Sequence, residues 1–199
     1  MTGNIIFIDT ETAGLLDSDP TIQLAAIVTR DWQEVESFER KIAFDHKRVA
    51  DPEALIEING FDPDVWAAEA LPAEEALRDF VGFFEKHKDL ELTGKTGGSY
   101  KVARVAGHHI TGFDIPRINR GVKHFGLFWA ALWWYPLDTF QRAVWHFAEL
   151  GLESPANYRL PTLARHFGLD TSGAHDALAD CRLSMQLARK FATWEGSQR

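Results

Sequence analysis

The chain has 199 residues, of which 45% are hydrophobic, so it is long enough to fold as one domain with a substantial apolar core. Its formal net charge of −8 argues against a protein that coats nucleic acid through a broad basic surface. A single cysteine, Cys181, excludes an intramolecular disulfide and a multi-cysteine zinc site.

Three β-strands are predicted near the start of the chain. Residues 4–9 form a short apolar run that is rich in β-branched residues and bounded by turn residues, as is typical of a strand buried on both faces. Residues 21–32 and 35–44 follow as strands, with "RDWQE" as the turn between them. Because their connections are short, these three strands are expected to pair antiparallel.

The rest of the chain alternates helices with strands. Proline, aspartate and glycine punctuation predicts helices over 51–60, 72–87, 115–125, a segment ending at Leu150, 160–168 and 176–194. Further strands are predicted over 102–110 and 134–139, and the glycine-rich segment 92–101 is predicted to be a surface loop without phosphate-loop spacing. This order predicts a single α/β domain, residues 1–199, around a mixed sheet.

Two acidic residues, Asp9 and Glu11, stand at the end of the first predicted strand. Alternate residues of a strand point to one face, so both carboxylates are expected together at the carboxyl end, where open α/β sheets place their sites. Carboxylates at close range repel one another unless a cation lies between them, and Mg²⁺ prefers such oxygen ligands. Strand ends that merely face water carry the same short pattern, so the pair alone leaves both interpretations open.

Two further carboxylates are candidates for the same place. Asp114 follows the predicted strand 102–110 and begins a helix, a position that also suits a helix N-cap. Asp180 borders the buried stripe of the last helix, where an acid needs a partner. His175 precedes Asp180 by five residues, about 140° of helical rotation, and is therefore expected in the loop that enters the helix. Asp176 is either an extra ligand or a favourable charge at the helix start.

The segments "FIDTETAGL", "GHHITGFDIPRI" and "AHDALADCRL" together resemble, in order and approximate spacing, the three exonuclease motifs of the DEDDh family. "PLDT", around Asp138, also resembles the aspartate–threonine segment that precedes the third motif of that family. The family includes the epsilon proofreading subunit of bacterial DNA polymerase III, ribonuclease T and TREX-type exonucleases. The resemblance implies a ribonuclease H-like fold, with a central mixed five-stranded sheet flanked by helices.

The resemblance also implies a metal-dependent 3′–5′ exonuclease that hydrolyses the 3′-terminal phosphodiester of DNA and releases nucleoside 5′-monophosphates. It implies two divalent cations, Mg²⁺ or Mn²⁺, held by Asp9, Glu11, Asp114 and Asp180. His175, at the H-x-x-x-x-D spacing of this branch, would be the general base. An exonuclease that trims or degrades RNA and a catalytically silent nucleic-acid-binding module remain alternatives.

Recognition of the 3′ end is expected from the turn after the first motif. By resemblance, Thr12, Gly14 and Leu15 would contact the terminal nucleotide, with Leu15 or Leu16 as an apolar wedge. Phe113 would stack or pack beside them. Leu15 and Leu16 equally suit a simpler role, in which they close the core.

Two positions depart from the family pattern. His109 stands where many relatives carry asparagine, and Asn59 where many carry a histidine that contacts the substrate. Because neither is one of the carboxylates, catalysis is expected to survive while substrate preference stays open. The basic residues Arg117, Arg120 and Lys123 are interpreted as a solvated helix face.

The expected partner is a nucleic-acid 3′ end, with DNA favoured over RNA, in proofreading or repair-type trimming. No apolar stretch suits a membrane span and no secretory signal is visible, so a cytoplasmic protein without a membrane partner is expected. A polymerase or a second copy of the chain is a possible protein partner. Trp133 and Trp134 are adjacent, so both cannot point inward if this segment is a strand. One of them is then expected to be exposed and to mark such a surface.

Overall fold

The structure is a computed structural model that describes the chain apart from residues 1–2, 17, 50, 58–60, 174–175 and 198–199. The strands are β1 (Ile5–Thr12), β2 (Thr21–Arg30), β3 (Gln33–Lys41), β4 (Leu90–Thr93), β5 (Ser99–Gly107) and β6 (Ala131–Asp138). The helices are a 3₁₀ turn η1 (His46–Arg48), α1 (Pro52–Glu57), α2 (Pro63–Glu69), α3 (Ala73–His87), α4 (Asp114–His124), α5 (Thr139–Leu150), α6 (Leu160–His166) and α7 (Ala177–Ser197).

The strands form one mixed sheet in the order β3-β2-β1-β5-β4, with β6 also paired to β5. β2 is antiparallel to both β1 and β3, as predicted for strands with short connections. A tight turn joins β2 to β3 through Asp31 and Trp32, which have φ values of 50° and 63°. β5 runs parallel to β1 and β6, because the intervening chain crosses over through helices.

The sheet has six strands rather than five. The predicted surface loop 92–101 is in fact a β-hairpin, in which Leu90–Thr93 pairs antiparallel with Ser99–Val102. Gly97, with φ 86°, sits in its turn, and the Gly94 amide donates to the Gly98 carbonyl over 2.8 Å. The glycines that predicted an irregular loop therefore supply only the turn, while the residues on either side add the extra strand.

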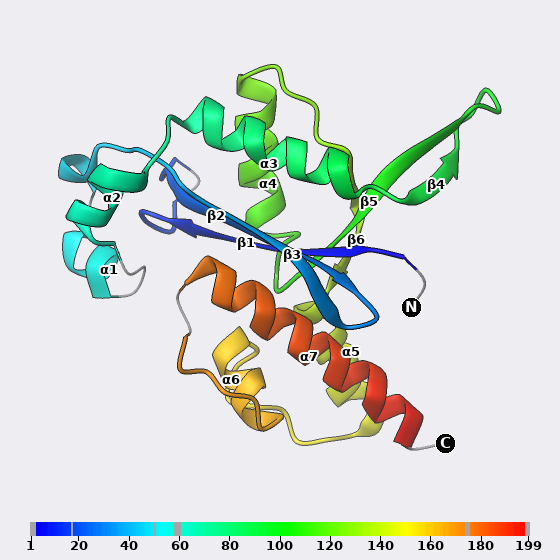
Figure 1. Cartoon of the computed structure of the whole chain (residues 1–199). Coiled ribbons are helices and arrows are strands. Elements are labelled where there is room, and N and C mark those ends of the chain that lie inside the picture. The colour runs from blue at the N-terminus through cyan, green and yellow to red at the C-terminus, as the bar shows by residue number, and fades with distance from the viewer. Residues whose placement is uncertain (1–2, 17, 50, 58–60, 174–175, 198–199) are drawn as a thin grey trace.

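Helices cover both faces of the sheet, with α3 and α4 on one side and α5, α6 and α7 on the other (Figure 1). β1 is the middle strand and separates two apolar layers. Ile5 and Phe7 belong to the layer that also contains Cys181 of α7, which is buried in the core. Asp9 and Glu11 continue the same alternation, so their side chains are directed toward the face that α7 covers.

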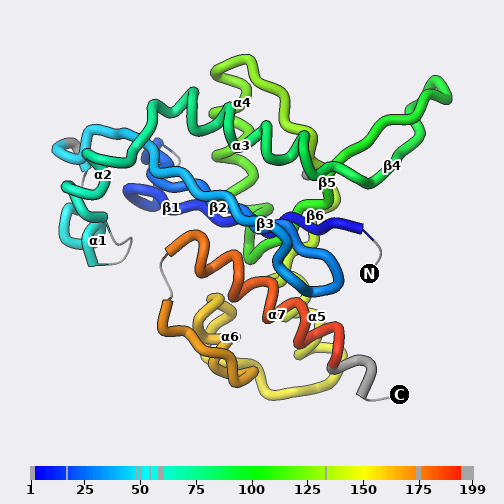
Figure 2. Tube along the Cα trace, in the orientation of Figure 1, coloured from blue at the N-terminus to red at the C-terminus, as the bar shows by residue number. Residues whose placement is uncertain are grey.

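The last helix, α7, is packed from two directions. Its predicted apolar stripe is confirmed, since Ala177, Cys181 and Phe191 are buried and Leu178 and Met185 are partly buried. A second apolar side packs against α5 and α6. The trace in Figure 2 shows α7 running beneath the sheet, with its first turn close to the carboxyl end of β1.

No helix in the described part of the chain combines the length and apolar character needed to cross a membrane.

Candidate active site

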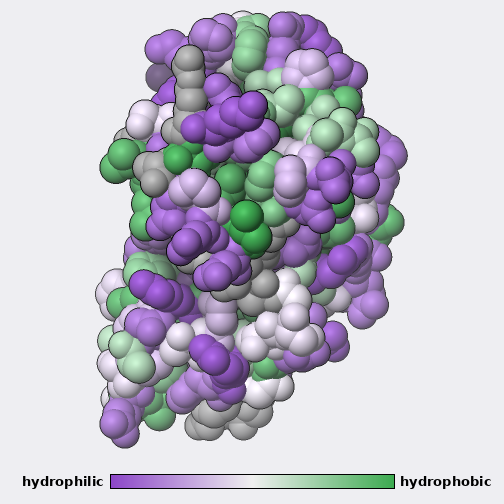
Figure 3. All heavy atoms as spheres, turned by 90° about the vertical axis from the view of Figure 1, so that its left-hand side faces the viewer, coloured by the Kyte–Doolittle hydropathy of each residue, from purple (hydrophilic) through white to green (hydrophobic). Residues whose placement is uncertain are grey.

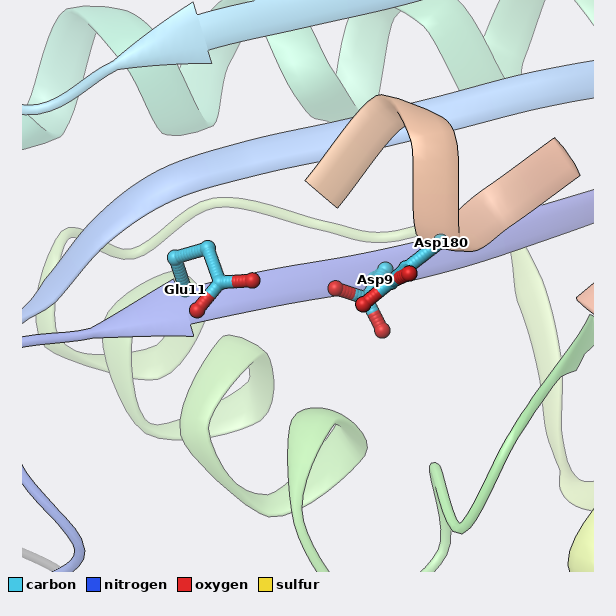
Figure 4. A group of neighbouring side chains, drawn as sticks. All are labelled: Asp9, Glu11 and Asp180. Carbon is cyan, nitrogen blue, oxygen red and sulfur yellow. The ribbon is translucent and has the colours of Figure 1, made fainter. Parts of the chain in front are cut away.

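Three carboxylates from two distant parts of the chain meet at the carboxyl end of β1. Asp9 and Glu11 come from β1 and Asp180 from the first turn of α7. One oxygen from each carboxylate lies within 4.8 Å of the other two, and Figure 4 shows Asp180 reaching toward Asp9. Oxygen donors at this spacing suit a hard divalent cation such as Mg²⁺. The predicted convergence of these three residues is therefore present in the fold.

Asp114 lies beside this trio and is only 2% exposed. It is the first residue of α4, and the Thr10 hydroxyl donates a hydrogen bond of 2.6 Å to its Oδ1. The N-cap position is Phe113, and no side-chain capping bond forms there, so the N-cap interpretation of Asp114 does not describe its position. Thr10 thus fixes one carboxylate oxygen.

Two of these four acids, Asp9 and Asp114, hold their protons more tightly than a free aspartate does. Burial raises the pKa of Asp9 well above its ordinary value, and the neighbouring charges of Asp114, Asp180 and Glu11 raise it further. Burial also raises the pKa of Asp114, from 3.8 to about 7, although the hydrogen bonds from Thr10 oppose the rise. Such a cluster is unfavourable when all its members are ionised, and a cation among them would relieve the repulsion. The donor set therefore fits a divalent metal.

Asp176 caps α7 rather than joining the three clustered oxygens. Its Oδ1 accepts from the Ala179 amide at 2.9 Å, and its Oδ2 accepts from the Gln23 side-chain amide at 3.2 Å. Gln23, 2% exposed and paired across the sheet with Glu11, also donates to Glu39 at 2.9 Å. Gln23 was not predicted as a site residue, and it ties the start of α7 to the sheet beside the acids.

His175, the expected general base, lies outside the described residues, as does Asn59. The roles assigned to both positions therefore stay predictions.

Asp138 organises the segment that leads from β5 to Asp114. Its Oδ1 accepts from the His109 and Phe140 amides, each at 2.9 Å, and its Oδ2 accepts from the Thr111 hydroxyl at 2.9 Å. One carboxylate thus caps α5 and anchors the loop before α4. Gly107 begins this loop where a Cβ would come within 2.7 Å of the Ile8 carbonyl oxygen, so only glycine fits.

The two histidines of "GHHITGFD" support the same loop. His108 is partly buried, and its ring nitrogens contact the Thr139 hydroxyl and the Tyr158 carbonyl, each at 2.9 Å. Burial lowers the pKa of His108. His109 has φ 59°, a left-handed conformation that asparagine tolerates better than most residues. The asparagine expected there from the family pattern is thus compatible with this backbone.

The turn after β1 presents two leucines to solvent. Leu15 is 87% exposed and Leu16 is 66% exposed, so these residues do not close the core. The turn itself is tight, since the Thr12 hydroxyl donates to the Gly14 carbonyl at 2.6 Å and a Cβ at Gly14 would collide with the Asp19 carboxylate. Hydrophobic side chains are exposed among hydrophilic ones on the face that contains this end of the sheet (Figure 3).

The basic residues of α4 do not form one solvated face. Arg120 and Lys123 are exposed, but Arg117 is only 7% exposed and contacts both the turn after β1 and Phe113. The sequence-based interpretation is therefore wrong for Arg117.

No family model matches the chain, and no curated protein matches it in sequence. Solved structures match its fold. E. coli exonuclease I with a dT13 oligonucleotide aligns over 99% of this chain with a TM-score of 0.74 and 20% identity. The zinc-bound E. coli exonuclease I complex with single-stranded DNA aligns over 98%, with a TM-score of 0.74 and 19% identity.

Exonuclease I from Methylocaldum szegediense aligns over 96% of this chain, with a TM-score of 0.70 and 22% identity. The chain spans only 42%, 42% and 40% of the lengths of these three proteins. The shared architecture, a central mixed sheet flanked by helices, is the ribonuclease H-like fold that was expected.

Proposed function

We propose that this protein is a DEDDh-type 3′–5′ exonuclease that shortens DNA from its 3′ end. The observation that carries the proposal is the meeting of Asp9, Glu11 and Asp180 within 4.8 Å, in a fold shared with exonucleases crystallised with single-stranded DNA. Buried Asp114 beside them completes the implied acid set. The acids suit phosphodiester chemistry because the backbone is anionic and its developing charge must be neutralised.

In this proposal the four acids hold two divalent cations, Mg²⁺ or Mn²⁺. Such cations stabilise charge on a phosphate and lower the pKa of a bound water. His175 would accept a proton from the attacking water, a task that suits an unperturbed pKa of about 6.5. The water oxygen forms a new bond to phosphorus, the P–O3′ bond breaks, and the leaving O3′ takes up a proton. The products are a nucleoside 5′-monophosphate and a chain shortened by one nucleotide, with a 3′-hydroxyl end.

A direct test uses 5′-labelled single-stranded DNA, duplex DNA and RNA of one sequence. Each substrate is incubated with Mg²⁺, with Mn²⁺ and with a chelator. We expect a ladder of products that shortens from the 3′ end, present with metal and absent with chelator. Intact substrate under every condition would contradict the proposed function, and cleavage of RNA alone would favour the alternative of an RNA-trimming enzyme.

A catalytically silent binding module is the remaining alternative. Such a module is expected to have lost an acid or the base, whereas all five residues are present in the sequence. Proofreading and repair-type trimming are the roles that we propose for the activity, and a polymerase would be the natural partner for the former.

We expect His175→Ala to lower turnover by roughly 10²- to 10⁴-fold, the usual contribution of a general base. Affinity for single-stranded DNA should change little, because the acids and the 3′-end turn are left intact. Steady-state kinetics and fluorescence anisotropy measure the two quantities. His124→Ala, at the exposed end of α4, is the matched control and should behave as wild type. Near-normal turnover of the His175 variant would remove this residue from the mechanism.

The aromatic residues of β6 favour self-association as the expected protein contact. Arg104 pairs with Leu132 and Ala106 with Leu137, so residues 133–136 lie outside the regular ladder. Trp134 is 60% exposed and Tyr135 is 75% exposed there, in line with the prediction for one of the two tryptophans. The side chain of Trp133 is outside the described part of the structure.

We therefore expect a wild-type dimer that Trp134→Ala converts to a monomer in light scattering, since the variant removes exposed apolar area. Tyr100→Ala, at an exposed aromatic residue of the β4–β5 hairpin, is the control and should leave the mass unchanged. A wild-type monomer, or a dimer that survives Trp134→Ala, would exclude this surface as a dimer contact.

A further inference from the structure

Arg117 is a charged side chain buried at the edge of the candidate active site. It lies in the first turn of α4, three residues after Asp114, and is 7% exposed. A buried guanidinium needs hydrogen-bond acceptors, and Arg117 finds them on the backbone. Its Nη1 donates to the Phe113 carbonyl at 3.1 Å, and its Nη2 lies 3.3 Å from the Leu15 carbonyl and 3.4 Å from that of Leu16.

The same guanidinium also stacks on an aromatic ring. Cζ of Arg117 lies 3.7 Å from the centroid of the Phe113 ring. A cation this close to an aromatic face is attracted to it, more strongly when both are shielded from water. Arg117 therefore restrains the backbone of the turn after β1 and the ring of Phe113 at once.

The two elements that Arg117 connects are far apart in the chain. Leu15 and Arg117 are separated by 102 residues, yet Arg117 bonds to the backbone of the turn and not to its side chains. The leucine side chains consequently remain exposed, at 87% for Leu15 and 66% for Leu16. The exposed side chain of Leu15 extends from a restrained backbone near the carboxylate cluster, and it is therefore well placed to contact a terminal base.

We propose that Arg117 is a positioning residue for the 3′-terminal nucleotide, which sets the separation between Leu15 and Phe113. The inference rests on the proposed function and deepens it by naming what holds the end-recognition surface together. Arg117 acts through these two residues, because its guanidinium donates to the backbone of the turn and stacks on the Phe113 ring. Lysine cannot replace it, since an ammonium lacks the planar fork that reaches two segments and stacks on a ring.

The test compares Arg117→Lys with wild type in steady-state cleavage of a 5′-labelled single-stranded oligonucleotide. We expect KM to rise about tenfold while kcat stays within about threefold, because the acids are untouched and only ground-state positioning is lost. Arg120→Lys makes the same change at an exposed residue of α4 and should match wild type.

A second readout separates positioning from a general loss of structure. Linear DNA with a 3′-hydroxyl and circular DNA of the same sequence compete with the labelled substrate. Wild type should prefer the linear competitor, and Arg117→Lys should lose most of that preference. Equal preference in the two proteins, or an unchanged KM, overturns the inference.

A poorly folded Arg117→Lys protein is recognised by its thermal melt. Phe113→Leu then provides the test, because it removes the stacked ring while leaving the arginine in place, and it should raise KM. Phe113→Tyr keeps an aromatic ring and should have the wild-type KM. Failure of the ring variants to change KM also overturns the inference. An inactive wild-type protein overturns the proposed function itself, whereas an active wild type with unaltered variants overturns only the role of Arg117.

Discussion

Asp9→Asn is expected to lower nuclease turnover by at least about 10³-fold and, in the absence of metal, to stabilise the fold. The catalytic loss follows because Asp9 stands at the centre of the acid cluster, where an amide cannot replace a charged ligand. The stabilisation follows because burial and four neighbouring carboxylates raise the pKa of Asp9, so that its charge is unfavourable in the folded protein. A neutral side chain of the same shape removes that repulsion.

Calorimetry in the presence of a chelator measures the second effect. We expect the melting temperature to rise on the order of 5 °C, which corresponds to one or two kcal/mol for a chain of this size. Asp64→Asn makes the same chemical change at an exposed position in the first turn of α2 and should leave activity unaltered. An Asp9→Asn protein that keeps its activity, or that melts lower than wild type without metal, would contradict the assignment of Asp9 to a metal site.

The regular part of the fold could be predicted because its pattern is local. The apolar run of β1 and the short turn before β3 are readable from neighbouring residues. The helix α2 was missed, although Asp62 caps it with hydrogen bonds to two backbone amides and Pro63 stands in its first turn. This punctuation is typical of a helix start, so α2 is readable from local sequence.

The strand β4 could not be predicted in the same way. Four residues, Leu90–Thr93, lack a buried face of their own and become a strand only by pairing with Ser99–Val102. Glycine-rich composition describes the turn between these segments and carries no information about the pairing on either side. The pairing of β4 with β5 depends on contacts between the two strands, which local composition does not reveal.

The residues of the candidate site also differ in whether local sequence predicts them. Asp9 and Glu11 were found because alternation on a strand is a local rule, and Asp114 and Asp180 because a family pattern links them. Arg117 was misinterpreted as solvated because its burial depends on carbonyl oxygens of a turn 102 residues away. When the partners of a side chain are backbone atoms far away in the sequence, its neighbours in the sequence do not reveal its role.

Ionisation of Asp114 is expected to destabilise the metal-free protein as pH rises from about 4 to about 7, against the opposite effect of His108, whose pKa is lowered by burial. In the folded chain Asp114 has a pKa of about 7, against an ordinary value of 3.8. The folded state therefore holds a proton in this range that the unfolded state has released, so raising the pH favours unfolding. The shift corresponds to roughly 4 kcal/mol lost between the two limits for Asp114. Asp9, whose pKa is also raised, acts in the same direction.

Divalent metal should reverse this dependence, because a cation binds the ionised acids of the folded state and not the dispersed acids of the unfolded chain. Denaturant titrations at pH 5 and pH 8, each with Mg²⁺ and with chelator, give the free energy of unfolding under the four conditions. Mg²⁺ should stabilise the protein strongly at pH 8 and weakly at pH 5, where protons compete for the carboxylates. Asp114→Asn is the matched variant, and it should flatten the metal-free pH profile. Metal-free pH profiles that are the same in wild type and in Asp114→Asn would contradict the raised pKa of Asp114.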